Sequence, residues 1–130
     1  MMTDPIADLA TRLRNANVAY HPTVKIPHSR LKAGLLKLLA REGMIRGVVE
    51  EGDGVKKTLS VAMAYGPNRE RLLSGIRRVS RPGLRTYAGK DALPRARAGR
   101  VAIVSTSKGL LTSAEAKRHN VGGEVLLEVW

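Results

Sequence analysis

The sequence contains no cysteine and no phenylalanine, and it has one tryptophan and three tyrosines among 130 residues. Without cysteine, neither a disulfide framework nor a thiolate metal site can form. The histidines His21, His28 and His119 also lack the spacing of metal ligands. A hydrophobic core must therefore be built from aliphatic side chains, and we expect no cofactor and no metal.

Long apolar runs are also missing. No stretch approaches the roughly 20 residues that span a membrane, and the first residues lack a signal-peptide pattern. We therefore expect a soluble, cytoplasmic protein with no membrane partner.

Acidic residues are scarce: 11 Asp and Glu stand against 23 Lys and Arg, which gives a net charge of +12 at pH 7. Such a field on a short chain attracts polyanions, and nucleic acids first. Residues 69–108 hold 11 basic residues and only two acidic ones. We therefore expect the partner to face the middle and later part of the chain.

The first half of the chain alternates between helical and strand patterns. Asp4-Pro5 predicts a helix start, and the helix carries an apolar stripe at three- and four-residue spacing, with Thr11, Arg14 and Asn15 on a polar edge. Residues 23–27 predict a short strand. A second helix then follows, with four leucines inside it: Leu31, Leu35, Leu38 and Leu39. Residues 44–50 and 57–65 predict a hairpin, and residues 72–79 a third strand.

The start of the second helix contains a local electrostatic conflict. Ser29 predicts its N-cap, but Arg30 and Lys32 lie in the first turn, where the helix dipole favours negative charge. An external anion would resolve the conflict. The alternatives are a phosphate contact at Ser29, Arg30 and Lys32, or a merely exposed turn.

Beyond the Pro82-Gly83 turn, Arg85 and Tyr87 are two residues apart in an extended segment and project from one face. An arginine beside an exposed aromatic ring is typical of stacking on unpaired bases, although Tyr87 could equally be a half-buried packing residue. Residues 88–100 are interpreted as a linker that crosses from the N-terminal half to the C-terminal half.

Three hydroxyls and a cation follow the apolar run of residues 101–104: Ser105, Thr106, Ser107 and Lys108. Each hydroxyl can donate and accept, which suits a partner with phosphate oxygens, ribose hydroxyls and base edges. The alternative is a simple turn in which the hydroxyls bond their own backbone.

The last part of the chain predicts a short helix and a final strand. Thr112-Ser113-Ala114-Glu115 matches a capping box, and Gly122-Gly123 leads into a strand over residues 124–130. If this strand neighbours residues 101–104, then Gly122, Gly123 and Glu124 approach the hydroxyl triplet. A carboxylate there repels DNA but can accept a bond from a ribose 2′-hydroxyl or a base amino group.

These elements predict an α/β (α+β) protein of two small domains. Residues 1–79 form an N-terminal domain, helix-strand-helix followed by a three-stranded antiparallel sheet. Residues 80–130 form a C-terminal RNA-binding domain of strands with one short helix. A hydrolytic triad of Ser105 or Ser107 with His119 and Glu124 is disfavoured, because the sequence has no Gly-x-Ser-x-Gly elbow and His119 ends a short helix beside Lys117 and Arg118. The sequence has no phosphate-loop pattern either. We expect no enzyme.

A series of short motifs runs from the first helix to the last residue: Asp4-Pro5-Ile6-Ala7-Asp8 with Thr11 and Arg14-Asn15-Ala16, Pro27, Ser29, Arg81-Pro82-Gly83-Leu84-Arg85-x-Tyr87, Ala102-Ile103-Val104-Ser105-Thr106-Ser107-x-Gly109, Thr112, Ala116, Gly122-Gly123-Glu124 and Trp130. No single piece is specific, but the ordered set resembles the bacterial family of the eighth small-subunit ribosomal protein. One departure is Arg97-Ala98-Gly99-Arg100, where the family has Asn-Gly-Leu-Gly or a similar loop.

The resemblance implies a structural constituent of the small ribosomal subunit, which binds the central domain of its RNA, nucleates assembly there and neighbours other ribosomal proteins. In some bacteria the family also represses its own operon by binding the messenger RNA. The implied main RNA contacts are Ser105, Thr106, Ser107, Gly122, Gly123 and Glu124, with Tyr87 stacking. The implied supporting contacts are Thr3, Asp4, Arg14, Ser29, Arg30 and Lys32. The alternative is a free-standing basic regulator that binds DNA or RNA.

Overall fold

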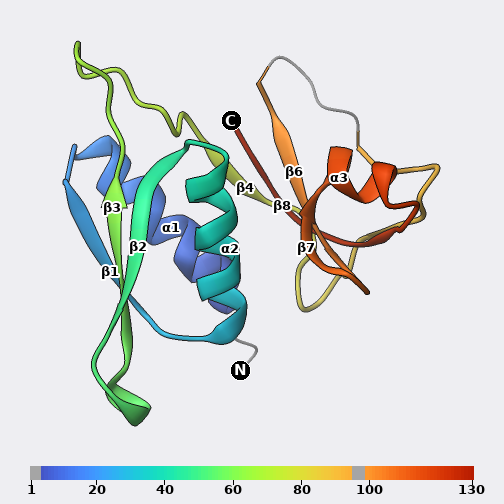
Figure 1. The fold of residues 1–130 in the computed structure, drawn as a ribbon, viewed down its shortest axis with the longest axis horizontal. Coiled ribbons are helices and arrows are strands. Elements are labelled where there is room, and N and C mark those ends of the chain that lie inside the picture. Colours follow the sequence, from blue (N-terminus) through green and yellow to red (C-terminus); the bar gives the residue numbers. More distant parts are fainter. Residues whose placement is uncertain (1–3, 95–98) are drawn as a thin grey trace. The chain divides into compact units, whose positions relative to one another are not determined.

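The computed structural model describes residues 4–94 and 99–130. They divide into two compact units, Pro5–Ser74 and Asp4 with Gly75–Trp130. Figure 1 shows the helices and strands of both units. The prediction of domains at 1–79 and 80–130 stays a prediction, and the residues between Gly75 and Val79 group with the later part of the chain.

The unit Pro5–Ser74 contains two helices and a three-stranded antiparallel sheet. Its elements are α1 (Pro5–Val18), β1 (Thr23–Pro27), α2 (Arg30–Arg41), β2 (Ile45–Glu51), the short 3₁₀ helix η1 (Gly54–Lys56) and β3 (Thr58–Met63). The strand order is β1-β3-β2, so the predicted hairpin of β2 and β3 is confirmed and β1 is the third strand. Helix α1 contacts β1, α2 contacts β2, and the two helices contact each other.

The aliphatic core of this unit follows the predicted periodicities. The stripe of α1 is buried, and alternate residues of β3 are buried with it: Ile6, Leu9, Ala10, Leu13, Ala16, Leu59, Val61 and Met63. The start of α2 differs from the prediction, because Leu31 is 42% exposed whereas Lys32 is only 6% exposed. Leu36 takes the interior place expected for Leu31, since burial on α2 centres on residues 35, 36, 38 and 39.

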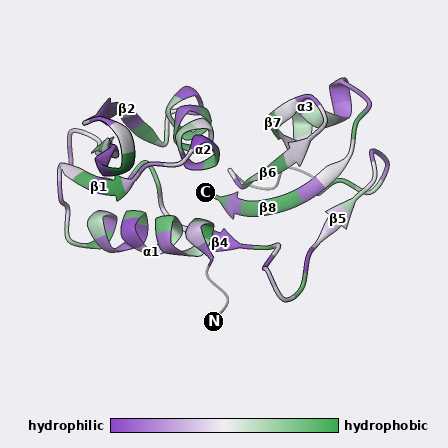
Figure 2. Cartoon of the chain, turned by 90° about the horizontal axis from the view of Figure 1, so that it is seen from below, coloured by the Kyte–Doolittle hydropathy of each residue, from purple (hydrophilic) through white to green (hydrophobic). Residues whose placement is uncertain are grey.

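The unit of Asp4 and Gly75–Trp130 is built around its last strand. Its elements are β4 (Ile76–Arg78), β5 (Tyr87–Ala88), β6 (Val101–Thr106), β7 (Gly109–Thr112), α3 (Ser113–Arg118) and β8 (Gly123–Val129). Strand β8 pairs with β6 along one edge and with β4 and β5 along the other, and β7 extends the sheet beyond β6. Figure 2 shows β8 as hydrophobic along its middle and hydrophilic near its ends, in keeping with the buried Val125, Leu126 and Leu127.

Three sequence predictions for this unit are wrong. The strand expected over residues 72–79 is only β4, and it pairs with β8 rather than with the hairpin. Residues 88–100 do not link the two halves, because β5 at their start and β6 after them both pair with β8. The chain after the hydroxyl triplet does not pass directly into a helix, since Gly109–Thr112 first forms β7. None of the helices in the described ranges is long and apolar enough to cross a membrane.

Candidate nucleic-acid interface

One end of the β8 sheet brings most of the predicted contact residues into two cross-strand rows. In the first row Tyr87 pairs with Glu124, Glu124 with Ser105, and Ser105 with Leu110. In the second row Ala88 pairs with Gly123, Gly123 with Thr106, and Thr106 with Gly109. Because directly opposed residues of antiparallel strands project from the same face, Tyr87, Glu124 and Ser105 share one face of the sheet. The predicted approach of Gly123 and Glu124 to the triplet is therefore present, whereas Gly122 lies against Ala88 and Gly89.

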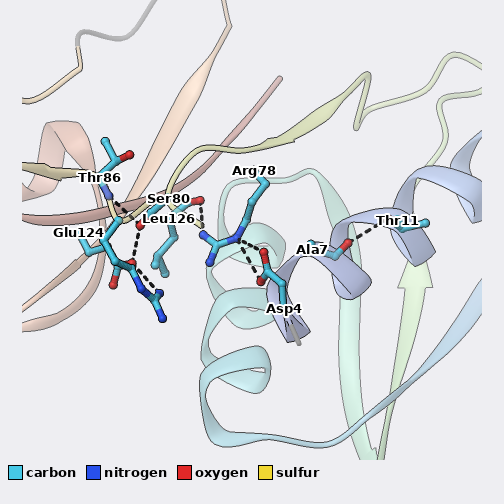
Figure 3. A network of polar contacts seen from close by, with 9 residues as sticks. Asp4, Ala7, Thr11, Arg78, Ser80, Thr86, Glu124 and Leu126 are labelled. Atoms are coloured by element: carbon cyan, nitrogen blue, oxygen red, sulfur yellow. Dashed lines mark hydrogen bonds and ion pairs between the residues drawn. The ribbon is translucent and has the colours of Figure 1, made fainter. Parts of the chain in front are cut away.

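The carboxylate of Glu124 is held in place by its own protein. The hydroxyl of Ser80 donates to Glu124 Oε2 at 2.5 Å (Figure 3). Arg85 Nη1 donates to the same oxygen at 2.9 Å. Ser80 is fully buried, and its oxygen also accepts a bond from the backbone N–H of Thr86. Among the described residues no hydrogen bond goes to Oε1 of Glu124, so this oxygen can accept a bond from a ligand.

These partners also set the charge of the carboxyl group. Burial by itself raises the pKa of Glu124, but the hydrogen bonds from Ser80 and Arg85 and the charges of Arg85 and Arg78 outweigh it. The net result is a pKa below the usual range, so the group is an anion at neutral pH and acts only as an acceptor.

The hydroxyl triplet divides into two kinds of residue. Thr106 Oγ1 donates to the Gly109 carbonyl at 2.8 Å and accepts from the Lys108 N–H at 3.0 Å, so it closes the turn between β6 and β7. For Thr106, the turn interpretation holds. The hydroxyls of Ser105 and Ser107 have no such partner within the described ranges, and Ser107 and Lys108 are exposed in the turn. Donors and acceptors for a ligand therefore remain at Ser105 and Ser107.

Tyr87 presents an aromatic ring to solvent beside this turn. It lies in β5 and is 70% exposed, so it is not a half-buried packing residue. The side chain of Arg85 is also largely exposed while it contacts Glu124. An exposed ring next to a cation and an acceptor is a suitable platform for an unpaired base.

The two glycines before β8 allow the strands to approach closely. A Cβ atom on Gly123 would overlap the carbonyl oxygen of Ser105, and one on Gly122 would overlap that of Ala88. Sequence reasoning assigned them a turn and a contact, and the structure adds that any side chain would push the strands apart. It also adds Ser80, whose role depends on a contact across 44 residues and has no local sequence signal.

Much of the basic segment of residues 69–108 is paired within the protein. Arg78 donates to the carboxylate of Asp4 at 3.1 Å and to the Leu126 carbonyl (Figure 3). Arg77 and Arg100 both form ion pairs with Glu128. The guanidinium groups of Arg69 and Arg71 lie over the ring of Tyr20. Arg81, Lys90 and Lys108 are exposed and have no ion pair in the described part of the chain. Arg95 and Arg97 lie outside the described residues.

The supporting contacts are placed as follows. Thr3 lies outside the described residues, and the Asp4 carboxylate is engaged by Arg78. Arg14 is exposed on α1. Ser29 caps α2 as predicted, since its hydroxyl accepts from the Lys32 N–H at 3.1 Å, and Arg30 is exposed. Burial lowers the pKa of the Lys32 ammonium, while the Asp8 charge opposes this shift and the Arg12 charge adds to it.

No cluster of ligands that could hold a metal ion occurs in the ranges that the structure describes. The Glu124 carboxylate bonds Ser80 and Arg85 rather than a histidine, so the triad of the sequence analysis is not assembled around it. An exposed tyrosine, two hydroxyls without a partner in the described ranges and a fixed acceptor on one sheet end of a small, basic α+β fold are features of the class of nucleic-acid-binding proteins.

Comparison with known proteins specifies the family. The family model described as Ribosomal protein S8 matches residues 4–130. The small ribosomal subunit protein uS8 of Rhodococcus erythropolis is 58% identical over 130 residues, which cover 99% of this chain and 98% of the relative. That of Caldanaerobacter subterraneus subsp. tengcongensis is 50% identical over 131 residues, which cover 100% and 99%. The chain therefore belongs to the ribosomal protein S8 family.

Membership confirms several predictions together. The resemblance drawn from the ordered motifs is correct, and so is the α+β fold class. As a member of this family the chain is a structural constituent of the small ribosomal subunit and not an enzyme. The alternative of a free-standing regulator finds no support in these matches.

Proposed function

We propose that this chain binds small-subunit ribosomal RNA through the β8 sheet end, defined here as Arg85, Tyr87, Ser105, Thr106, Ser107, Lys108, Gly122, Gly123 and Glu124. The observation that supports this assignment best is the first cross-strand row, which aligns an exposed ring, a fixed carboxylate and an unpaired hydroxyl: Tyr87, Glu124 and Ser105. Each side chain in this row offers a different kind of contact. Tyr87 can stack on a base, Glu124 can accept a hydrogen bond, and Ser105 can donate or accept one.

An RNA target fits these groups better than duplex DNA. Glu124 is an anion that repels phosphate, but its Oε1 can accept a bond from a 2′-hydroxyl or a base amino group. Tyr87 can stack only on a base that has left the helix, such as one in an internal bulge. The exposed cations Arg81, Lys90 and Lys108 supply phosphate attraction that carries no sequence information.

Within this sheet end the residues have separate tasks. Ser105, Ser107, Tyr87 and Glu124 contact the RNA directly. Thr106 shapes the turn that presents Ser107 and Lys108, Gly122 and Gly123 let the strands approach, and Arg85 steadies Glu124. The proposal also keeps the supporting contacts Thr3, Asp4, Arg14, Ser29, Arg30 and Lys32. The side chains of Asp4 and Lys32 contribute indirectly, through the residues next to them, because Asp4 is paired with Arg78 and Lys32 is buried.

The target is the central domain of the RNA, where binding nucleates assembly and places the chain beside neighbouring ribosomal proteins in the cytoplasmic ribosome. Binding of the messenger RNA of its own operon is a second proposed activity of the same sheet end. A messenger that mimics the ribosomal site presents the same unpaired bases and ribose hydroxyls, so it needs no further residues.

The decisive experiment measures binding of the purified protein to small-subunit ribosomal RNA with duplex DNA as competitor, at low and at physiological salt. We expect RNA binding to survive at the higher salt without competition from DNA, because a shaped site depends on more than counterion release. Equal binding of both nucleic acids, lost together with salt, would reduce the function to charge alone and overturn the proposal.

A further inference from the structure

The sheet of the unit Pro5–Ser74 has two outer strands, because its order β1-β3-β2 leaves β1 at one side and β2 at the other. An outer strand presents backbone N–H and C=O groups without a partner, and proteins usually protect them. Figure 1 shows the β2–β3 hairpin extending beyond the end of α2, with η1 at its tip. We call the outer side of Gly47–Glu51 the β2 edge and compare it with the outer side of β1.

The outer side of β1 is protected. The N–H of Met63 in β3 donates to the carbonyl of Pro22 at 2.9 Å, and from there the residues of β1 alternate, so Lys25 and Pro27 face away from β3. The Lys25 carbonyl accepts a bond from Arg12 Nη1 at 3.2 Å, and Pro27 has no N–H. A further strand would therefore find few free backbone groups beside β1.

The β2 edge lacks this protection. Because Met63 bonds toward β1, its neighbour Ala62 bonds toward β2, where Gly47 lies opposite. Continuing from Gly47, alternation directs the N–H and C=O groups of Val48 and Glu50 outward. No hydrogen bond reaches these backbone groups within the described ranges. They form a short row of donors and acceptors at the spacing that an extended peptide matches.

An apolar side chain accompanies the open backbone. Val49 is 63% exposed and lies on the face of the sheet opposite to the buried Val61, since it is paired with Ser60. Glu51 lies two residues further on and shares this outer face. Neither side chain belongs to the RNA-binding sheet end, so the proposed RNA contacts do not account for an exposed valine here.

The charge of the β2 edge is opposite to that of the chain as a whole. Three of the 11 acidic residues lie within residues 50–53 of a chain with a net charge of +12. Glu50 is compensated, because its carboxylate lies 2.9 Å from His28 Nε2 and 3.4 Å from Lys57 Nζ. Glu51 and Asp53 are exposed and form no ion pair with other described residues. Negative charge at this place repels phosphate and attracts a basic segment.

We propose that the β2 edge takes up an extended, basic segment of a neighbouring small-subunit protein as a fourth strand. Its backbone bonds Val48 and Glu50, its apolar side chain lies on Val49, and a lysine or arginine two residues away reaches Glu51. A second copy of this chain is a poor occupant, because two chains of +12 repel each other. This inference rests on the proposed place beside neighbouring ribosomal proteins, and it names the surface and the kind of segment.

Hydrogen exchange tests the proposal directly. The exchange of the full-length protein is followed at residue resolution in three states: alone, bound to small-subunit ribosomal RNA, and in subunits reconstituted from that RNA and the total small-subunit proteins. We expect the amides of Val48 and Glu50 to exchange about tenfold more slowly in the reconstituted subunit and nowhere else. Unchanged exchange there would overturn the proposal.

The same measurement separates the other occupants. Protection that is complete with RNA alone would assign the β2 edge to RNA. Protection of the free protein that rises with its concentration would assign the edge to a second copy. Either result overturns the proposal. If the protein fails to bind RNA specifically while the edge is still protected in reconstituted subunits, the proposed RNA-binding function falls and the docking surface stands.

Opposite charges placed at Val49 test the chemistry of the segment. Labelled Val49→Lys and Val49→Glu each compete with the unlabelled wild type for incorporation into reconstituted subunits. The same two substitutions at Val18, which is 65% exposed at the end of α1, are the matched controls. A basic segment should exclude Val49→Lys about fivefold and accept Val49→Glu, while both Val18 variants incorporate like the wild type.

The order of the two Val49 variants decides the outcome. Better incorporation of Val49→Lys than of Val49→Glu would mean that an anion lies against the edge, and equal incorporation of both with the wild type would mean that nothing charged does. Each of these results overturns the basic partner. Urea unfolding of the four variants shows whether a loss of incorporation reflects a loss of folding instead, and a Val49→Lys variant that loses incorporation only by unfolding would also overturn it.

Discussion

The buried hydroxyl of Ser80 donates a hydrogen bond to Glu124 Oε2 at 2.5 Å and accepts one from the Thr86 N–H at 2.9 Å. One small side chain thus connects the segment after β4, the segment before β5 and the first residues of β8. The proposed acceptor for RNA is positioned by a residue that is itself fully buried.

Substitution of Ser80 should therefore affect both stability and recognition. Ser80→Ala leaves the Thr86 N–H unpaired and removes one donor from Glu124, so the free energy of unfolding should fall by about 1–3 kcal/mol. Specific RNA binding should also weaken, because only Arg85 is then left to hold the Glu124 carboxylate and it does not fix the group by itself. Urea unfolding and RNA titration measure the two effects, with the exposed Ser74→Ala as control. An unchanged affinity at full folding would show that Ser80 does not position Glu124 for the ligand.

Thr106 and Ser107 are adjacent but should respond in opposite ways. Thr106→Ala removes both bonds that close the β6–β7 turn, so stability should fall by about 1 kcal/mol. Ser107→Ala removes an exposed hydroxyl without a partner in the described residues, so stability should hold while specific RNA binding loses about 1–3 kcal/mol. Thermal unfolding and binding to specific and nonspecific RNA test the pair. An equal loss on both RNAs for Ser107→Ala would refute its proposed role.

The features that the sequence predicts correctly depend on neighbours in the chain. The Ser29 cap and the capping box of Thr112 and Glu115 act within three residues, and the β3 alternation follows from the two-residue period of a strand. These signals survive because tertiary packing adds to them rather than opposing them.

The features that the sequence missed depend on contacts between distant segments. The sequence pattern does not reveal β7 (Gly109–Thr112), because the last residue of this strand is also the cap of α3 and the helix signal masks the strand. The bond between Ser80 and Glu124 spans 44 residues. Lys32 is buried although its charge predicts exposure, since its long apolar stem can lie against α2 and α1 neighbours.

Tyr87 should contribute to binding and little to folding. It is 70% exposed in a two-residue strand, so Tyr87→Ala should leave unfolding nearly unchanged while RNA binding loses about 1–3 kcal/mol of stacking. Tyr87→Phe keeps the ring and should restore most of the affinity. If Phe binds as weakly as Ala, the hydroxyl rather than the ring makes the contact.

Glu124 should make stability depend on acid pH. Its pKa in the folded protein lies below the usual value of 4.5, so the unfolded chain binds a proton more readily. The stabilising contribution is therefore complete above about pH 4.5 and is lost as the pH falls through the lowered folded pKa. Urea unfolding of the wild type and Glu124→Gln between pH 7 and pH 3 tests this. The difference between the two stability curves should shrink toward acid pH, and parallel curves would contradict the shift.

Gly123 and Gly89 offer the sharpest comparison at the sheet end. A Cβ on Gly123 overlaps the Ser105 carbonyl oxygen, whereas one on Gly89 has no atom within 4 Å. Gly123→Ala must push β8 away from β6, so it should destabilise the fold by about 2 kcal/mol or more and weaken RNA binding as Ser105 and Glu124 separate. Gly89→Ala should leave both nearly unchanged. Urea unfolding and RNA titration of the two variants measure the stability and the affinity. If Gly123→Ala keeps the affinity of the wild type, the close pairing of β6 and β8 is not required for recognition.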